Sequence, residues 1–440
     1  MVIMEKYIEL ALKNLKIASL NKMQKESIEV NKTQQDCVLL SPTGSGKTLA
    51  FLLPLLRFLD EKQNHVQALI ITPTRELAIQ IESVFRSLGT PFKVNATYGG
   101  HSMRVEENNF IQAPAVLVGT PGRICDHIQR GNLDLENVST LILDEFDKSL
   151  EMGFHDQMEY ILAYTKGLKK RMLVSATEMS EIPTFTGIKD SIEINYLVEK
   201  SDNLTLKMVV SNEKDKLQSL FDLICQNSNE PTIIFCNHRE PVERVAEFLA
   251  DLGIVVTFFH GGLEQAERER TLIKFRNGSS NYLVTTDLAA RGLDIPEIKY
   301  IIHYHLPLTK DAFIHRNGRT ARMSASGTSF LLVTKDEELP KYILEQNIPV
   351  EAIKEESFLP KEPKWETLYM SGGKKDKINK IDIVGFLSKK GNLEKDDLGL
   401  IIVQDFTSYA AVNRKKIRQV LAAIKDEKIK GKKLKIGISR

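Results

Sequence analysis

The sequence Cys37-Val38-Leu39-Leu40-Ser41-Pro42-Thr43-Gly44-Ser45-Gly46-Lys47-Thr48 runs from a short apolar segment, through a glycine-rich turn, into a second apolar segment of helical length. A strand, a turn of small residues and a helix that begins at Gly-Lys-Thr form a phosphate-binding loop, because backbone N–H groups can then surround a phosphate at the helix N-terminus. We expect Lys47 to reach the β- and γ-phosphates of a nucleotide and Thr48 to bind Mg²⁺. The other loop residues expected to bind the nucleotide are Ser41, Thr43, Gly44, Ser45 and Gly46.

A pair of acidic residues further along the chain complements this loop. The apolar run Leu141-Ile142-Leu143 is followed directly by Asp144-Glu145-Phe146-Asp147. An acid at the carboxyl end of a strand lies where ligands bind in open α/β sheets. Together with the phosphate loop, Asp144 is expected to hold Mg²⁺, partly through water, and Glu145 to position the attacking water. Considered alone, two acids after a strand would as often cap a helix.

The rest of the chain alternates short apolar runs with segments of helical length over residues 30–335. Continuous apolar strands indicate parallel sheets that are covered on both faces. A single sheet of more than ten strands would be unusually wide, so we expect two α/β domains. Polar residues near 200–203 and the segment Pro360–Pro363 mark the breaks between domains. We therefore predict domains over residues 1–200, 205–360 and 365–440.

Charge is distributed unevenly along the 440 residues, although the net charge is only +2. Residues 361–440 contain 20 Lys and Arg against 10 Asp and Glu, a net of +10, and the first 360 residues carry a net of −8. A basic tail on an acidic body points to a polyanionic partner. A lysine-rich end that only improves solubility is the alternative at this stage.

Cysteine use and hydropathy indicate the compartment. The four cysteines form no CxxC pair and have no histidine at metal-ligand spacing, which is typical of free thiols in a reducing cytosol. No apolar run approaches the ~20 residues that a membrane span needs. The N-terminus lacks the features of a signal peptide. We expect a cytoplasmic protein with no membrane association.

Further motifs follow the two described above in a characteristic order. They are Pro73-Thr74-Arg75-Glu76-Leu77, Gly99-Gly100, Thr120-Pro121-Gly122-Arg123, Ser175-Ala176-Thr177, Ile234-Phe235-Cys236-Asn237, His260-Gly261-Gly262, Gln265-Ala266-Glu267-Arg268, the segment 285–296 and the segment 315–322. With these motifs, residues 15–335 resemble a DEAD-box RNA helicase of helicase superfamily 2. The resemblance implies two RecA-like parallel-sheet domains in tandem, ATP and Mg²⁺ as cofactors, and RNA-stimulated ATP hydrolysis coupled to local unwinding of short RNA duplexes.

The resemblance also implies roles for the matching residues. Arg319 and Arg322 would join Lys47, Thr48, Asp144 and Glu145 as catalytic residues, acting as arginine fingers on the γ-phosphate. Gly292 and Asp294 would help to bind the nucleotide, and Ser175, Thr177 and His315 would couple hydrolysis to unwinding. The residues expected to contact the RNA backbone are Pro73, Thr74, Arg75, Gly100, Thr120, Arg123, Gly261, Gln265, Arg268 and Thr286.

Three positions depart from the family pattern. Gln24 resembles the glutamine that reads adenine, but residues 19–24 lack the two prolines usual there, and an ordinary helix glutamine is the alternative. Phe146 replaces an alanine, which we expect local packing to accommodate. His305 stands where an aspartate commonly supports the Ser175–Thr177 motif. It could add a pH response to this coupling, or it could be a neutral histidine that faces solvent.

The basic tail has the order β-α-β-β-α-β of a small α+β, RRM-like domain. We predict strands at 380–387, 400–403, 408–412 and 433–438, with a helix at 416–424. Of the aromatic positions that stack bases in such domains, Tyr409 keeps one, Ala411 occupies another, and Asp382 would stand on the first strand. Weak base stacking is therefore expected, with lysine-rich loops carrying the binding.

The phrases Lys380–Gly385 and Asp397-Leu398-Gly399 resemble the DbpA-type RNA-binding domain. That resemblance implies structured ribosomal RNA of the large subunit, and so pre-ribosomal particles, as partners of a monomeric enzyme. The residues predicted to contact phosphates are Lys374, Lys375, Lys377, Arg414 and Lys415. A DNA helicase would share the motor fold, but the Asp-Glu-x-Asp tetrad, Gln24 and the RNA-recognition tail argue against it. The alternatives are an ATP-gated RNA clamp or scaffold and a messenger-RNA remodeller for growth in the cold.

Overall fold

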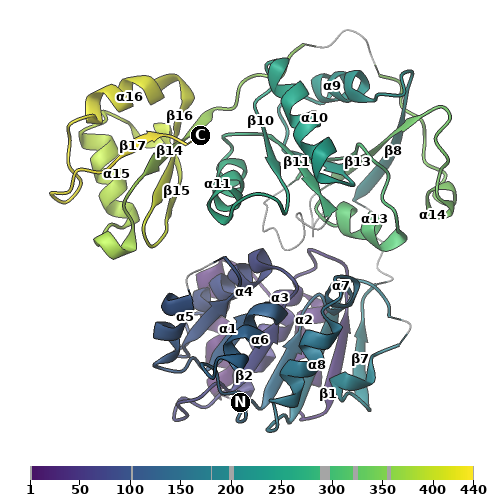
Figure 1. The fold of residues 1–440 in the computed structure, drawn as a ribbon, viewed down its shortest axis with the longest axis vertical. Helices are drawn as coiled ribbons and strands as arrows, with labels where there is room; N and C mark the ends of the chain where they lie inside the picture. The colour runs from purple at the N-terminus through teal and green to yellow at the C-terminus, as the bar shows by residue number, and fades with distance from the viewer. Residues whose placement is uncertain are drawn as a thin grey trace. The chain divides into compact units, whose positions relative to one another are not determined.

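The computed structural model describes residues 2–100, 103–179, 181–197, 203–287, 298–320, 326–353 and 358–439. The chain forms two compact units that divide between residues 202 and 203, and the described strands make three sheets (Figure 1). The two predicted parallel sheets and the small C-terminal sheet are all present. Among the described helices, none is both long and apolar enough to cross a bilayer.

The first unit contains a seven-stranded sheet in the order β3-β4-β2-β5-β6-β1-β7, in which every neighbouring pair is parallel. Its strands are β1 (Asp36–Leu40), β2 (Ala68–Ile71), β3 (Val94–Thr97), β4 (Val116–Gly119), β5 (Thr140–Leu143), β6 (Lys170–Ser175) and β7 (Ser191–Asn195). The helices are α1 (Val2–Leu15), α2 (Lys22–Val30), α3 (Lys47–Leu55), α4 (Arg75–Ser87), α5 (Met103–Phe110), α6 (Pro121–Gln129), α7 (Phe146–Glu151) and α8 (His155–Ala163).

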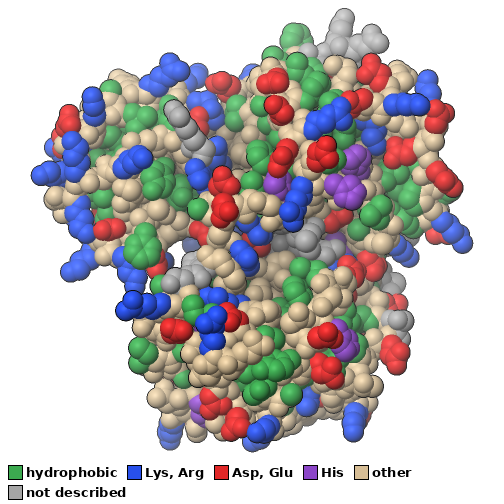
Figure 2. Space-filling view, in the orientation of Figure 1, with side chains coloured by type: hydrophobic (Ala, Val, Ile, Leu, Met, Phe, Trp, Pro, Cys, Tyr) green, Lys and Arg blue, Asp and Glu red, His purple; other side chains and the backbone are tan. Residues whose placement is uncertain are grey.

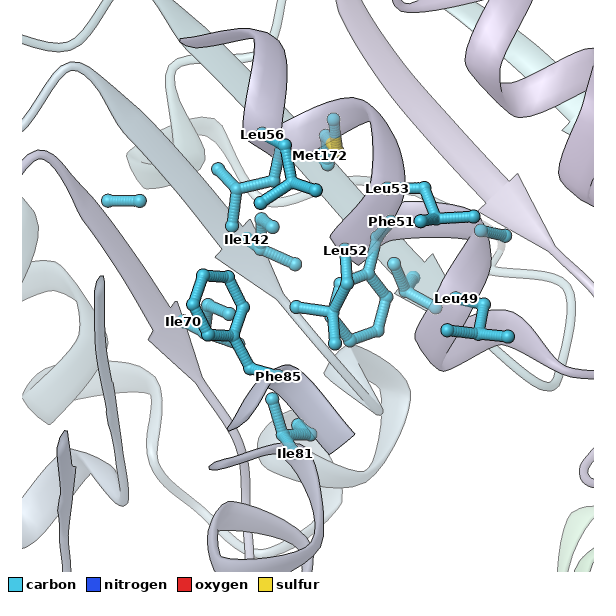
Figure 3. Close-up of a cluster of buried hydrophobic side chains, with 14 of the residues drawn as sticks. Leu49, Phe51, Leu52, Leu53, Leu56, Ile70, Ile81, Phe85, Ile142 and Met172 are labelled. Carbon is cyan, nitrogen blue, oxygen red and sulfur yellow. The ribbon is translucent and has the colours of Figure 1, made fainter. Parts of the chain in front are cut away.

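Helices cover both faces of this sheet, and alternate residues of each strand therefore enter different cores. Figure 3 shows Phe51 and Leu52 of α3 and Phe85 of α4 against Ile70 and Ile142 of the strands. On the opposite face, neighbouring strand residues pack against α6, α7 and α8. Burial on both faces explains why these strands are continuous apolar runs in the sequence. Phe146, the residue that replaces alanine, is fully buried in the second of these cores, so packing does accommodate it.

The second unit begins with another parallel sheet, in the order β10-β11-β9-β12-β13-β8. Its strands are β8 (Leu204–Ser211), β9 (Thr232–Cys236), β10 (Val256–Phe259), β11 (Tyr282–Thr286), β12 (Tyr300–His303) and β13 (Gly327–Thr334). The described helices are α9 (Leu217–Gln226), α10 (Arg239–Asp251), α11 (Gln265–Arg276), α13 (Lys310–Asn317) and α14 (Lys341–Leu344).

The C-terminal sheet of the second unit is antiparallel, in the order β15-β16-β14-β17. Its elements are β14 (Trp365–Met370), α15 (Lys380–Lys389), β15 (Leu398–Val403), β16 (Ser408–Asn413), α16 (Ile417–Ile424) and β17 (Ile436–Ile438). The order β-α-β-β-α-β is confirmed, but the first strand is β14.

The strand predicted at residues 380–387 is wrong, because this segment is helix α15. Asn379 caps the helix: its side chain accepts from the N–H of Asp382, whose carboxylate accepts from the N–H of Asn379. This reciprocal pair satisfies the first free N–H groups of a helix. Ile383, Phe386 and Leu387 then follow the helical spacing and enter the core. Asp382 is therefore a helix-capping residue and occupies no stacking position on a strand.

Candidate nucleotide site and nucleic-acid interface

The loop between β1 and α3 has the shape that a phosphate requires. Gly44 and Gly46 adopt φ of +81° and +90°, which favours glycine, and a Cβ on Gly46 would lie 2.6 Å from the Gln24 side-chain nitrogen. Lys47 Nζ lies over the loop and donates to the carbonyls of Ser41 (2.6 Å) and Pro42 (2.9 Å). The loop residues predicted from the sequence are thus gathered at the N-terminus of α3, where backbone N–H groups can hold an anion.

The acidic residues after β5 form a crowded, buried cluster. Burial and the neighbouring Glu145 raise the pKa of Asp144 to about 7, although Lys47 acts in the opposite direction. Glu145 has φ +47°, in the left-handed region, and its buried Oε2 has no hydrogen-bond partner among the residues that the structure describes. Buried carboxylates without compensation are costly, and a divalent cation would relieve that cost. The donor set of Asp144 and Thr48, all oxygen, fits Mg²⁺.

Gln24 lies against the phosphate loop, and Asn21 joins it there. Asn21 and Gln24 form a capping box at the start of α2, with hydrogen bonds of 3.0 Å and 2.9 Å. Their side-chain nitrogens donate to the loop carbonyls of Ser45 (2.9 Å) and Gly46 (3.1 Å). Gln24 therefore ties α2 to the nucleotide loop, and its contact with adenine stays a prediction. Asn21 was missed from the sequence, although its position three residues before Gln24 is a capping signal.

The Ser175–Thr177 segment at the end of β6 contacts the acidic cluster directly. Thr177 Oγ1 donates to Asp147 Oδ2 at 2.6 Å, and Ser175 Oγ donates to the Thr177 carbonyl at 2.7 Å. β5 and β6 are neighbours in the sheet, so both loops emerge at the same edge. Asp147, the last acid of the 144–147 segment, thus joins the acidic site to the segment predicted to couple hydrolysis to unwinding.

The predicted RNA contacts of the first unit gather at the carboxyl ends of β2, β3 and β4, which are adjacent strands. Thr74 caps α4 and Thr120 immediately precedes α6. Gly100 has φ +96°, and Gly99 is so close to Arg75 that a Cβ there would lie 3.1 Å from the guanidinium. Pro73 lies in the same turn as Thr74. Segments distant in the sequence therefore share one edge of the sheet.

Glu106 of α5 is a residue of this edge that sequence reasoning missed. Its buried carboxylate accepts hydrogen bonds from Thr97 (2.7 Å), Arg123 Nε (2.8 Å) and His127 Nε2 (2.6 Å). These bonds oppose the effect of burial, and the pKa of Glu106 is lowered overall. The carboxylate thereby fixes the orientation of Arg123. No pattern in the sequence links Glu106 to residues on two other elements.

In the second unit, Arg316 organises helix α13, which directly precedes the predicted catalytic residue Arg319. Arg316 is 1% exposed and binds both carboxylate oxygens of Asp287, at 2.5 and 2.7 Å. It also donates to Asn237 Oδ1 (2.8 Å) and to the His305 carbonyl (2.6 Å). The predicted residues His315 and Arg319 are buried beside it on α13 and the following turn. Arg322, Gly292 and Asp294 lie outside the described residues.

The other predicted RNA contacts of the second unit come from three segments. Gly261 precedes α11, Gln265 and Arg268 lie on its first turns, and Thr286 ends β11. Arg268 lies over the Phe259 ring, 5.1 Å from its centroid, which holds the guanidinium beside β10. β10 and β11 are adjacent in the sheet, so these segments share one edge.

His305 is half-buried, which contradicts the expectation of a solvent-facing side chain. Its Nδ1 accepts a hydrogen bond from the backbone N–H of Asn237 at 3.3 Å. Burial lowers the pKa of His305 to about 4, with Lys216 acting in the same direction. His305 is therefore neutral at physiological pH, and the possible pH response is not supported. Its neighbour His303 is also neutral, because burial lowers its pKa to about 3.

The basic residues of the C-terminal domain fall into two groups. Lys374, Lys375, Lys377 and Lys415 are exposed, as phosphate-binding residues should be. Arg414 instead donates to Glu366, Pro363, Trp365 and Ser279. Four hydrogen bonds to protein acceptors use most of the N–H donors of this guanidinium, so Arg414 is less available to a phosphate than the exposed lysines, and its phosphate contact stays a prediction. Arg414 holds β14 and the segment before it in place.

Three known families match successive segments of the chain. Residues 21–184 match the DEAD/DEAH box helicase family, residues 215–324 the helicase conserved C-terminal domain, and residues 367–438 the DbpA RNA binding domain.

Two relatives resemble nearly the whole chain. The ATP-dependent RNA helicase DbpA of Bacillus subtilis (strain 168) is 34% identical over 97% of this chain and 96% of its own length. The ATP-dependent RNA helicase DbpA of Escherichia coli (strain K12) is 31% identical over 91% of this chain and 90% of its own length. Among solved structures, S. cerevisiae Dbp5 bound to RNA and ADP BeF3 has a TM-score of 0.70 at 26% identity, covering 79% of this chain and 93% of that one. The chain therefore belongs to the DEAD-box family of ATP-dependent RNA helicases and is a DbpA-like, ATP-hydrolysing enzyme.

Proposed function

We propose that this helicase couples RNA-stimulated ATP hydrolysis to local unwinding of short RNA duplexes, and that its RNA is structured ribosomal RNA of the large subunit in pre-ribosomal particles. The observation that carries the first part is the 2.6 Å hydrogen bond between Thr177 and Asp147. This bond connects the acidic segment 144–147 to the Ser175–Thr177 segment, so a movement of one segment during hydrolysis would also move the other.

Each predicted nucleotide-binding or catalytic residue has its own part in the proposed ATP hydrolysis. Lys47 and the loop N–H groups are proposed to hold the β- and γ-phosphates, and Gln24 is proposed to bind the adenine. Mg²⁺, held by Thr48 and Asp144, would supply positive charge to the phosphate oxygens. Glu145 orients a water toward the γ-phosphorus and accepts its proton as the bond to the β-phosphate oxygen breaks. Arg319 and Arg322 are proposed to stabilise the negative charge that develops on the γ-phosphate.

Replacing Thr177 with valine tests the coupling step. Valine keeps the side-chain volume but removes the hydroxyl that donates a hydrogen bond to Asp147. A hydrogen bond to a charged group contributes about 1.5–3 kcal/mol. We expect the number of duplexes unwound per ATP hydrolysed to fall by about tenfold or more. ATPase and unwinding rates would be measured on the same preparation. Thr165→Val is the control, because its hydroxyl donates to the Leu162 carbonyl and, among the described residues, bonds no carboxylate. Equal losses in both variants would rule out the coupling role.

The C-terminal domain supports the ribosomal part of the proposal. It matches the DbpA RNA binding domain, and residues 361–440 carry the net charge of +10. Figure 2 shows lysine and arginine side chains gathered along the rim of this domain, which is yellow in Figure 1. We further propose that the protein acts as a monomer in the cytoplasm. Its four cysteines are buried and free, as in a reducing compartment.

Reversing the charge of Lys374, Lys375 and Lys377 tests the RNA preference. In the wild type, we expect half-maximal ATPase stimulation at a lower concentration of large-subunit ribosomal RNA than of unrelated RNA. The triple glutamate variant should lose this difference and keep its maximal rate, because the affected lysines lie outside the motor. The control is a second triple glutamate variant, at the exposed lysines Lys389, Lys395 and Lys425, which changes the net charge by the same amount. A wild type that shows no preference would exclude the ribosomal target.

A further inference from the structure

The turn between β15 and β16 presents an aromatic ring to solvent. Phe406 is 66% exposed, and it is the only exposed aromatic side chain described within residues 365–439. The turn is well ordered by its own hydrogen bonds: Gln404 N donates to the Thr407 carbonyl at 2.8 Å, and Thr407 Oγ1 donates to Gln404 Oε1 at 2.7 Å. An exposed phenylalanine is costly to leave in water, and here it stands on a rigid support.

Lysines lie directly beside this turn. The backbone N–H groups of Lys374 and Lys375 donate to the carbonyls of Gln404 and Asp405, each at 2.9 Å. The side chains of Lys374, Lys375 and Lys377 are exposed, and no ion pair joins any of them to a carboxylate among the described residues. Two carboxylates lie nearby: Asp405, which is exposed in the turn itself, and Asp376 of the lysine loop, which pairs with Lys432 Nζ at 2.9 Å. The edge therefore combines an aromatic ring with a surplus of positive charge.

The open face of the C-terminal sheet, in contrast, is occupied by the protein itself. Thr367 of β14 is fully buried and bonds Asn277 Nδ2 and Ser279 Oγ at 2.8 Å each. Tyr409 of β16 lies opposite Tyr369 and is only 6% exposed. A base cannot stack on a side chain that is already covered. Tyr369 on this face is half-buried, whereas the Phe406 ring at the edge is exposed and offers the larger free aromatic surface.

The turn is also joined to the predicted RNA contacts of the motor. Glu269 of α11 accepts from Gln265 Nε2 at 3.0 Å through one oxygen and from Gln404 Nε2 at 2.8 Å through the other. Gln265 is one of the residues expected to contact the RNA backbone. A single carboxylate thus bridges the motor's RNA edge and the turn that carries Phe406.

We propose that residues 404–407 and the loop 374–377 form an RNA site, in which an unpaired base stacks on Phe406 and the lysines bind the adjoining phosphates. This inference rests on the proposed function in taking RNA as the ligand of the C-terminal domain, but it does not depend on the ribosomal target. The combination of an aromatic ring and flanking cations is how proteins hold single-stranded nucleic acid. The site continues toward α11 through Glu269, so one strand could contact both.

Variants of Phe406 in the full-length enzyme test this site. The probe is a fluorescent single-stranded oligouridylate, and the measurement is its dissociation constant. Base–aromatic stacking contributes enough that Phe406→Leu should weaken binding by about fivefold or more. Phe406→Trp should retain or improve affinity, because it keeps a stacking surface. Phe358→Leu is the matched control, since Phe358 is 92% exposed and lies outside this edge.

The outcomes separate this inference from the proposed function. Weaker binding in Phe406→Leu, with wild-type affinity in Phe406→Trp and Phe358→Leu, supports the site even if ribosomal RNA proves not to be preferred. Wild-type affinity in Phe406→Leu overturns it, and so does an equal loss in Phe358→Leu. Lys374→Glu with Lys375→Glu should also reduce the slope of log Kd against log salt by roughly 1.4, as two fewer phosphate contacts would. An unchanged slope would contradict the phosphate contacts.

Discussion

Glu145→Gln should reduce the RNA-stimulated ATPase rate by about 10²- to 10⁴-fold, the usual contribution of a positioned general base. Glutamine has the same shape but cannot accept the proton of the attacking water. Glu145 is buried, and its Oε2 makes no hydrogen bond, so the substitution breaks no described contact of that oxygen. The measurement is the steady-state ATPase rate at saturating RNA, together with the dissociation constants for RNA and for ATP.

Binding should survive this substitution, because the phosphate loop and the RNA-contacting edges are unchanged. Glu159→Gln, on the exposed face of α8, provides the control for removing one negative charge from the same unit. Turnover that persists in Glu145→Gln would remove this residue from the role of base. A parallel loss of ATP binding would show that the carboxylate organises the site and does not act on the water.

Arg316→Met should lower the free energy of unfolding of the second unit by about 3–5 kcal/mol, because it leaves the Asp287 carboxylate and several buried acceptors without their donor. Methionine retains much of the volume, so the loss comes from the broken hydrogen bonds with Asp287, Asn237 and the His305 carbonyl. Denaturant titration measures the free energy. Hydrogen exchange at α13 and β12 locates the change.

The exposed ion pair between Arg244 and Asp215 is the control for this prediction. The Arg244 side chain is 58% exposed. Exposed pairs contribute little, so Arg244→Met should cost about 1 kcal/mol or less. If both variants unfold at the same denaturant concentration as the wild type, Arg316 does not hold helix α13, and another contact must position Arg319.

Most of the motor fold could be predicted because its strands are buried on both faces. Segments such as Ala68–Ile71 and Thr232–Cys236 have no polar alternation, and a continuous apolar run is the signature of a covered parallel strand. Edge strands were harder to predict. β7 (Ser191–Asn195) and β8 (Leu204–Ser211) are only partly buried, so their sequences mix polar and apolar residues.

The error in the C-terminal domain has a local cause. Residues 380–387 contain Ile381, Ile383 and Val384, residues that favour strands, and their spacing over a few positions fits either period. The interaction that favours a helix is the capping box of Asn379 and Asp382. It forms only when each side chain adopts the rotamer that reaches the backbone N–H of the other residue. The true first strand, Trp365–Met370, alternates between a core face and a covered polar face.

The candidate site could be predicted as motifs but not as a network. Lys47, Asp144 and Glu145 carry their chemistry in their immediate sequence context. The partners that orient functional residues do not: Glu106 reaches Arg123 from another helix, and Arg316 reaches Asn237, which lies 79 residues before it. Such pairings depend on the order of strands in the sheet, which brings distant loops to one edge.

The dependence of ATP hydrolysis on RNA is tested by the ATPase rate of the purified full-length enzyme with and without RNA. We expect slow hydrolysis without nucleic acid and a large stimulation by RNA, with much less by DNA of the same length. Hydrolysis at the full rate in the absence of RNA would contradict this expectation, and so would an enzyme that stays inactive whatever RNA is added.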